Sequence, residues 1–262
     1  MADRIFRLLT LLLAGAALSL RAATFNVKSY GAAGNGHALD TDAINRAIAA
    51  AARAGGGTVE FPAGDYLAFS VHLQSNITLY LGPGAALVAA EPPADLSAGY
   101  DAPEPNPGAD QYQDFGHSHW HNSLIWGEDL ENVGITGPGR IFGRGLSRGT
   151  PGLRCDLPPG TPAGRTDPAL SLPPAIRDAI AAIKPGPFGY PGGETLPAGV
   201  GNKAIALKNC RNVLFRDFTV FHGGHFAILA TGVDNWTCDH VTIDTNRDGI
   251  DLDCCRNVRL SN

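Results

Sequence analysis

The C-terminal half of the chain repeats with a period of 22 to 23 residues. An asparagine marks the same place in each copy, at Asn212, Asn235 and Asn257, and earlier counterparts occur at Asn76 and Asn132. Each copy holds short stretches in which apolar and polar residues alternate, as in half-buried β-strands. A unit this short cannot bury its apolar face alone, so successive copies must stack. The repeat therefore predicts an all-β fold, a right-handed parallel β-helix.

Stacking also assigns structural roles to repeated residues. We expect each asparagine to bond to its counterpart in the next coil, as in other stacked-strand structures. The alternative is a plain turn preference, since asparagine tolerates left-handed backbone. Cys210, Val233 and Cys255 share one position of the repeat and are expected to form a column of small residues.

Residues 1–23 have the layout of a secretory signal peptide. Arg4 and Arg7 precede an unbroken run of apolar and small residues from Leu8 to Leu20, and Ala22 and Ala23 follow. The run is shorter than the roughly 20 residues that a membrane-spanning helix needs. We therefore expect a secreted or periplasmic protein with no membrane segment in its mature form.

The remaining residues, 24–262, are predicted to form one β-helix domain. A strand is expected over Phe25–Tyr30, and a short helix over Asp40–Ala54, capped by Asp40, Thr41 or Asp42. Segments 91–114 and 146–199 are irregular in pattern, and we interpret them as loop insertions over a regular scaffold.

Composition excludes several classes of function. The 20 basic residues are spread along a chain of net charge −5, which argues against a nucleic-acid partner. The five cysteines include no Cys-x-x-Cys pair, so no structural metal site is expected. Most of them are interpreted as buried free thiols, with one disulfide left open. We expect a monomer that needs no cofactor.

The densest group of polar residues runs from Asn246 to Asp253. Ile250 and Leu252 alternate there with Asp251 and Asp253, so one face of the strand is buried and the other presents carboxylates, with Asp248 just before them. Three carboxylates this close are costly unless they bind something or one stays protonated. Such a cluster suits acid and base catalysis on a sugar. The repeat also predicts that His225 stacks on Asp248, which would make this face a substrate groove.

Other interpretations of these residues remain open. Asp-Gly is a common turn pair, so Asp248 alone could be structural. His225 could simply pack against its neighbours. Asp248, Asp251 and Asp253 could also bind Ca²⁺, which prefers hard oxygen ligands.

At these positions the sequence resembles the glycoside hydrolase family of polygalacturonases. The residues that carry the resemblance are Phe25 to Ala32, Gly34 to Gly36, Asp40 to Ile44, Gly55 to Val59, Pro62 to Tyr66, Leu124 to Gly143, and Asn246 to Asp251. The last segment is similar to the family's Asn-Thr-Asp signature, with Arg247 in place of threonine. The resemblance implies inverting hydrolysis of a galacturonan-type pectic polysaccharide. It implies that Asp248 is catalytic and that Asn246, Arg247, Asp251 and His225 contact substrate.

The family's Asp-Asp pair would lie one coil after Asp248, past Asn262. Its later histidine and its Arg and Lys are likewise absent from these residues, so the domain is predicted to be incomplete and the chain inactive as given. Two alternatives remain open. One is a pectate lyase-type enzyme that cleaves by β-elimination with Ca²⁺, and the other is a non-catalytic β-helix that binds polysaccharide.

Overall fold

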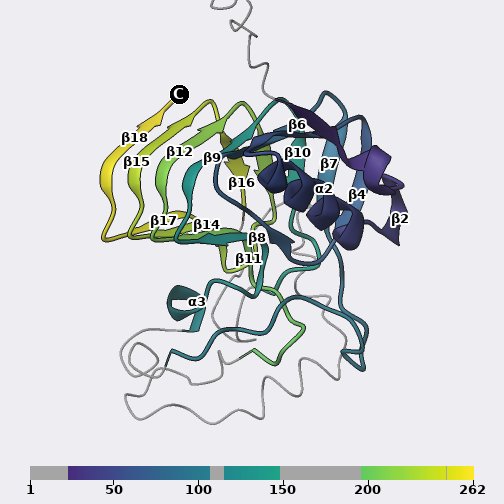
Figure 1. Cartoon of the computed structure of the whole chain (residues 1–262). Helices are drawn as coiled ribbons and strands as arrows, with labels where there is room; N and C mark the ends of the chain where they lie inside the picture. Colours follow the sequence, from purple (N-terminus) through teal and green to yellow (C-terminus); the bar gives the residue numbers. More distant parts are fainter. Residues whose placement is uncertain (1–22, 107–114, 148–195, 246) are drawn as a thin grey trace, which may run out of the picture.

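The computed structural model describes residues 23–106, 115–147, 196–245 and 247–262 (Figure 1). The predicted signal peptide, apart from Ala23, lies outside these residues. So do most of the insertion predicted at 146–199, residues 107–114 of the other insertion, and Asn246.

The strands stack into three parallel sheets, as Figure 1 shows. Sheet A has the order β1 (Thr24–Asn26), β3 (Gly57–Phe61), β6 (Ile77–Leu81), β9 (Glu131–Thr136), β12 (Arg211–Arg216), β15 (Asp234–Asp239) and β18 (Arg256–Ser261). Sheet B has the order β16 (Thr242–Asp244), β13 (Thr219–Phe221), β10 (Arg140–Phe142), β7 (Ala85–Ala89), β4 (Gly64–Ala68) and β2 (Asn35–Leu39). Sheet C has the order β17 (Asp248–Asp253), β14 (Phe226–Thr231), β11 (Lys203–Lys208), β8 (Ser123–Glu128) and β5 (Val71–His72).

Each full coil visits the three sheets in turn. β8, β9 and β10 form one coil, β11, β12 and β13 the next, and β14, β15 and β16 the third. Equivalent residues pair across coils: Leu207 faces Ala230, and Ala230 faces Leu252. The predicted right-handed parallel β-helix is confirmed.

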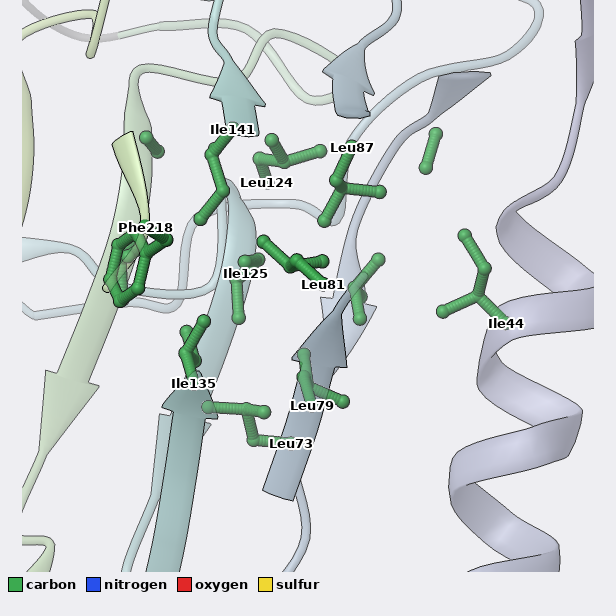
Figure 2. Close-up of a cluster of buried hydrophobic side chains, with 14 of the residues drawn as sticks. Ile44, Leu73, Leu79, Leu81, Leu87, Leu124, Ile125, Ile135, Ile141 and Phe218 are labelled. Atoms are coloured by element: carbon green, nitrogen blue, oxygen red, sulfur yellow. The ribbon is translucent and has the colours of Figure 1, made fainter. Parts of the chain in front are cut away.

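The apolar core runs through the inside of the coils. Ile44, Leu79, Leu124, Ile135 and Phe218 are among its members, and all are fully or almost fully buried (Figure 2). They come from helix α2 (Thr41–Arg53) and from different coils. Stacking therefore buries the apolar face that no single coil could bury, as expected for a solenoid.

The asparagine ladder is present. The side-chain amide of each asparagine donates to the side-chain oxygen of its counterpart one coil earlier, from Asn132 to Asn76 at 2.8 Å, from Asn212 to Asn132 at 3.0 Å, from Asn235 to Asn212 at 3.2 Å and from Asn257 to Asn235 at 3.0 Å. All five have positive φ, between 53° and 65°. The expected ladder of hydrogen bonds and the expected turn preference are therefore both present, because each asparagine adopts a left-handed backbone conformation and also bonds along the stack.

The N-terminal end differs from prediction in two details. The strand expected over Phe25–Tyr30 ends at Asn26, because the Asn26 side chain accepts from the backbone N–H of Lys28 and starts a 3₁₀ turn over Val27–Tyr30. Asp40 occupies the N-cap position of α2 but makes no side-chain capping bond. Its buried carboxylate instead accepts from the backbone N–H groups of Ala33 and Gly34, at 2.6 and 2.9 Å. Neither helix in the described part of the chain is long and apolar enough to cross a membrane.

The four cysteines that the structure describes are free thiols, and Cys155 lies outside the described residues. The column formed by Cys210, Val233 and Cys255 is confirmed: Cys210 and Val233 are buried, and Cys255 packs against them with its Sγ 3.4 Å from the Val233 nitrogen. Burial raises the pKa of Cys210 to about 11 and that of Cys238 to about 11.

We expect thiol alkylation to follow this burial. In native protein at about pH 8, iodoacetamide should modify exposed Cys254 first and leave Cys210 and Cys238 unmodified, because the thiolate is the reactive form. Peptide mass spectrometry before and after denaturation measures each site. Equal rates at all three sites in the native protein would contradict this packing.

Candidate active site

The acidic cluster lies on the last strand of sheet C, β17. Ile228 and Ala230 of the neighbouring strand β14 point into the core, whereas Leu229 belongs to a separate apolar cluster on the outer face. In register, Ile250 and Leu252 face inward, and Asp251 lies beside Leu229 on the outer face. The register thus has the predicted alternation, but the predicted buried face is not seen: Ile250 is only partly buried against the core and Leu252 is 39% exposed.

The predicted stacking of His225 on Asp248 is wrong by one position. Asp248 pairs with Phe226, so His225 precedes the paired residue. The cause is the length of the coils: β11 and β14 are offset by 23 residues, since Lys203 pairs with Phe226, but β14 and β17 are offset by 22. His225 itself is buried on the outer side of the coil, 1% exposed, and its ring lies 4.5 Å from that of Phe226.

Asp248, the first residue of β17, is exposed to solvent. Its side chain is 61% exposed, and the Arg247 guanidinium Nε lies 3.9 Å from its Oδ2. The Arg247 side chain is much more buried, at 16%. A cation thus lies beside a solvent-accessible carboxylate, at positions that the sequence motif singled out. Asn246, the third residue of the motif, lies outside the described residues.

A histidine that the sequence analysis missed contacts the site. His117 lies in the short helix α3 (Phe115–Ser118), and its Nε2 is 2.7 Å from Oδ2 of Asp251. Its ring packs edge-on against Phe226 at 4.6 Å and lies 6.2 Å from that of His225. Asp251, predicted to contact substrate, is therefore held by a residue of a distant loop. Figure 1 shows α3 beside sheet C.

Residues 115–121, which we call the covering segment, continue from α3 along the outer face. Trp120 packs on Ala206, Phe226 and Leu229, and its Nε1 donates to Oγ1 of Thr231 at 3.1 Å. The ammonium group of Lys208 lies 4.4 Å from the centre of its ring. The segment thus rests on the two strands that precede β17.

Ionic contacts surround the covering segment. Glu128 bonds to Lys208 at 2.8 Å and to His121 at 2.9 Å, and the hydrogen bond from Lys208 is the main cause of a lowered Glu128 pKa. Asp101 bonds to His72 and Trp126 at 2.7 and 2.8 Å. Burial is the largest single influence and acts to raise the pKa of Asp101, but these hydrogen bonds together with the charges of His72 and His121 outweigh it, and the pKa is lowered.

A calcium site is not supported by this geometry. No group of three or more His, Cys, Asp or Glu side chains in the described ranges is arranged to hold a metal ion. Asp251 is engaged by His117 instead.

Parts of the chain are similar to known proteins that act on carbohydrates. Residues 24–89 match the family model for rhamnogalacturonase A/epimerase, pectate lyase-like proteins. A probable polygalacturonase from Vitis vinifera is 33% identical over 133 residues, which are 49% of this chain and 26% of the relative. The resemblance to polygalacturonases of the pectate lyase-like superfamily is confirmed. The chain also shares 60% identity over 42 residues with alginate lyase 7 of Azotobacter vinelandii, 16% of this chain and 5% of that protein.

Solved structures share the fold. The family 28 exopolygalacturonase of Yersinia enterocolitica aligns with a TM-score of 0.64 at 24% identity, over 92% of this chain and 43% of that one. The exopolygalacturonase of Thermotoga maritima aligns at 0.59 and 20%, over 91% and 51%. Identities this low establish the fold alone. The chain spans about a quarter of the length of the Vitis protein, so the activity of a whole polygalacturonase is a proposal for this chain.

Proposed function

We propose that this chain is part of a glycosidase that hydrolyses a galacturonan-type pectic polysaccharide with inversion at the anomeric carbon. The observation that carries the proposal is the exposed Asp248 beside Arg247, on the outer face of the last strand of sheet C. The carboxylate can accept a proton from the attacking water, and the guanidinium can bind the carboxylate of a uronate unit. Family resemblance and side-chain chemistry point to the same two residues.

Asp251 and His117 have a supporting role in the proposal. The 2.7 Å contact fixes the Asp251 carboxylate on the same face as Asp248. A carboxylate held in this way can accept hydrogen bonds from sugar hydroxyls without first reorganising. His225 is buried behind this surface, so we propose that it supports the site by packing rather than by touching substrate.

Inverting hydrolysis also needs a carboxylic acid that protonates the leaving oxygen, about 6.5 to 9.5 Å from the base. The proposal places this acid one coil after Asp248. The same proposal expects little or no turnover from the 262 residues alone, and a signal peptide that directs the protein out of the cytoplasm.

The assay compares this chain with a C-terminally extended form on polygalacturonate. We expect the extended form to release new reducing ends, with no rise in the ultraviolet absorbance that an unsaturated product of β-elimination would give. Activity should survive a chelator. Chelator-sensitive formation of an unsaturated product would favour the lyase alternative, and equal turnover by the two forms would contradict the placement of the acid.

A further inference from the structure

His117, which contacts Asp251, belongs to a loop and not to the solenoid. Its helix α3 has only four residues, and its imidazole Nε2 lies 2.7 Å from the Asp251 carboxylate. A loop side chain can fix the direction of a carboxylate only where the loop itself is fixed. The orientation of Asp251 therefore depends on what holds the covering segment in place.

Packing holds the covering segment on both sides of His117. Before this residue, Gly116 lies so close to the buried His225 that a Cβ there would come within 2.5 Å of the imidazole Nε2. After it, the Trp120 side chain is buried in the outer apolar cluster with Phe226. The ring of His117 itself packs edge-on against Phe226. The side chain that contacts Asp251 thus lies between two buried contacts of its own segment.

The carboxylate of Glu104 holds the backbone of the covering segment. One of its oxygens accepts from the N–H of Trp120 at 2.8 Å and the other from the N–H of His121 at 3.1 Å. Hydrogen bonds to a charged acceptor are roughly twice as strong as neutral ones, and this side chain is only 15% exposed. Two residues further on, the side-chain amide of Asn106 donates to the carbonyl of Ser118 at 2.9 Å. One neighbouring loop therefore fixes the backbone directly after His117.

We propose that Glu104 is a positioning residue for the candidate active site, because it holds the covering segment where His117 can orient the Asp251 carboxylate for substrate. This inference rests on the proposed function, since it takes Asp251 as a contact to sugar hydroxyls. A carboxylate that is already oriented binds those hydroxyls without the entropic cost of ordering it first. In the proposed function Asp248, and not Asp251, activates the water. Loss of the order should therefore raise KM and leave kcat nearly unchanged.

The NMR signals of the His117 ring test the positioning itself, without any substrate. The full chain is labelled at its histidine ring nitrogens, and His117→Gln assigns the signals of this ring. Asp251→Asn shows where these signals lie once the charged partner is lost. Glu104→Gln keeps the size of the side chain but can no longer accept from both N–H groups, so the His117 signals should move toward their place in Asp251→Asn. Signals that stay at their original place in folded Glu104→Gln would overturn the inference.

Turnover of polygalacturonate by the C-terminally extended form links the positioning to substrate. Glu104→Gln should raise KM about tenfold, the equivalent of about one hydrogen bond, and change kcat by less than about twofold. In a background that already carries Asp251→Asn, it should have no further effect on KM. An unchanged KM, or an equal rise in that background, would overturn the inference and leave the proposed function standing. No turnover by the unsubstituted extended form would overturn the proposed function, and the His117 signals would still decide whether Glu104 positions Asp251.

Two further variants separate positioning from a general loss of stability or charge. Asn106→Ala removes its bond to the covering segment and leaves Glu104 in place, so it should move the His117 signals and KM in the same direction by a smaller amount. Glu131→Gln is the matched control, the same substitution at a carboxylate on sheet A whose side chain is 46% exposed. It should change neither quantity. A control that moved both as far as Glu104→Gln does would overturn the inference.

Discussion

Asp248→Asn is expected to remove about 10²- to 10⁴-fold of the hydrolytic rate of the extended protein, the usual contribution of a general base. The amide has the size of the carboxylate but cannot take a proton from water at neutral pH. The side chain of Asp248 is 61% exposed, so the substitution should leave the fold unaffected. Reducing-end release from polygalacturonate measures the effect.

Asp65→Asn provides the matched control for this substitution. Asp65 is an exposed aspartate on β4 of sheet B, away from sheet C. It should keep full turnover. The affinity of Asp248→Asn for galacturonate is measured as well. If Asp248 is catalytic, this variant should still bind galacturonate but should not hydrolyse it. Unchanged turnover in Asp248→Asn would show that Asp248 has no catalytic role.

The second large effect is on stability. Trp236→Ala should destabilise the protein by about 3 to 5 kcal/mol, because the side chain is fully buried and its ring packs edge-on against Phe215 at 5.4 Å. The indole Nε1 is buried with no hydrogen-bond partner in the part of the chain that the structure describes. Trp236→Phe therefore keeps most of the packing and gives up no hydrogen bond, so its cost should be much smaller.

Urea unfolding of the two variants measures this difference, with Leu39→Ala as the control. Leu39 is 52% exposed, and its truncation should change stability by less than about 0.5 kcal/mol. A Trp236→Phe variant as unstable as Trp236→Ala would mean that the indole N–H carries the interaction, which this packing does not allow.

The fold could be predicted because the solenoid repeats its own contacts. Asn212, Asn235 and Asn257 recur at one place in each coil, and each makes the same turn and the same bond. A periodic signal of this kind needs no knowledge of distant contacts. The column of Cys210, Val233 and Cys255 could be predicted for the same reason, since these residues share one position of the repeat.

Details set by a single residue were harder to predict. His225 and Asp248 occupy equivalent places if every coil has 23 residues, but the pairing of Phe226 with Asp248 shows that this coil has 22. A difference of one residue in coil length therefore moves the partner of Asp248 from His225 to Phe226. The sequence already carries the shorter spacing for this coil, since Asn235 and Asn257 lie 22 residues apart, whereas the prediction for His225 used 23.

Contacts made by the insertions could not be predicted. His117 reaches Asp251 from 134 positions away, out of a segment with no repeat and no periodic pattern. Glu104, Trp120 and Lys208 come from two loops and a strand. Nothing local in their sequences specifies that they meet, because their contact depends on how the loops fold over sheet C.

The anomeric configuration of the first product tests the central claim most directly. Polygalacturonate is digested by the C-terminally extended protein and followed by proton NMR before the product mutarotates. The account predicts a product of inverted configuration, absent when Asp248→Asn is used. A product of retained configuration, or an unsaturated one, would contradict it.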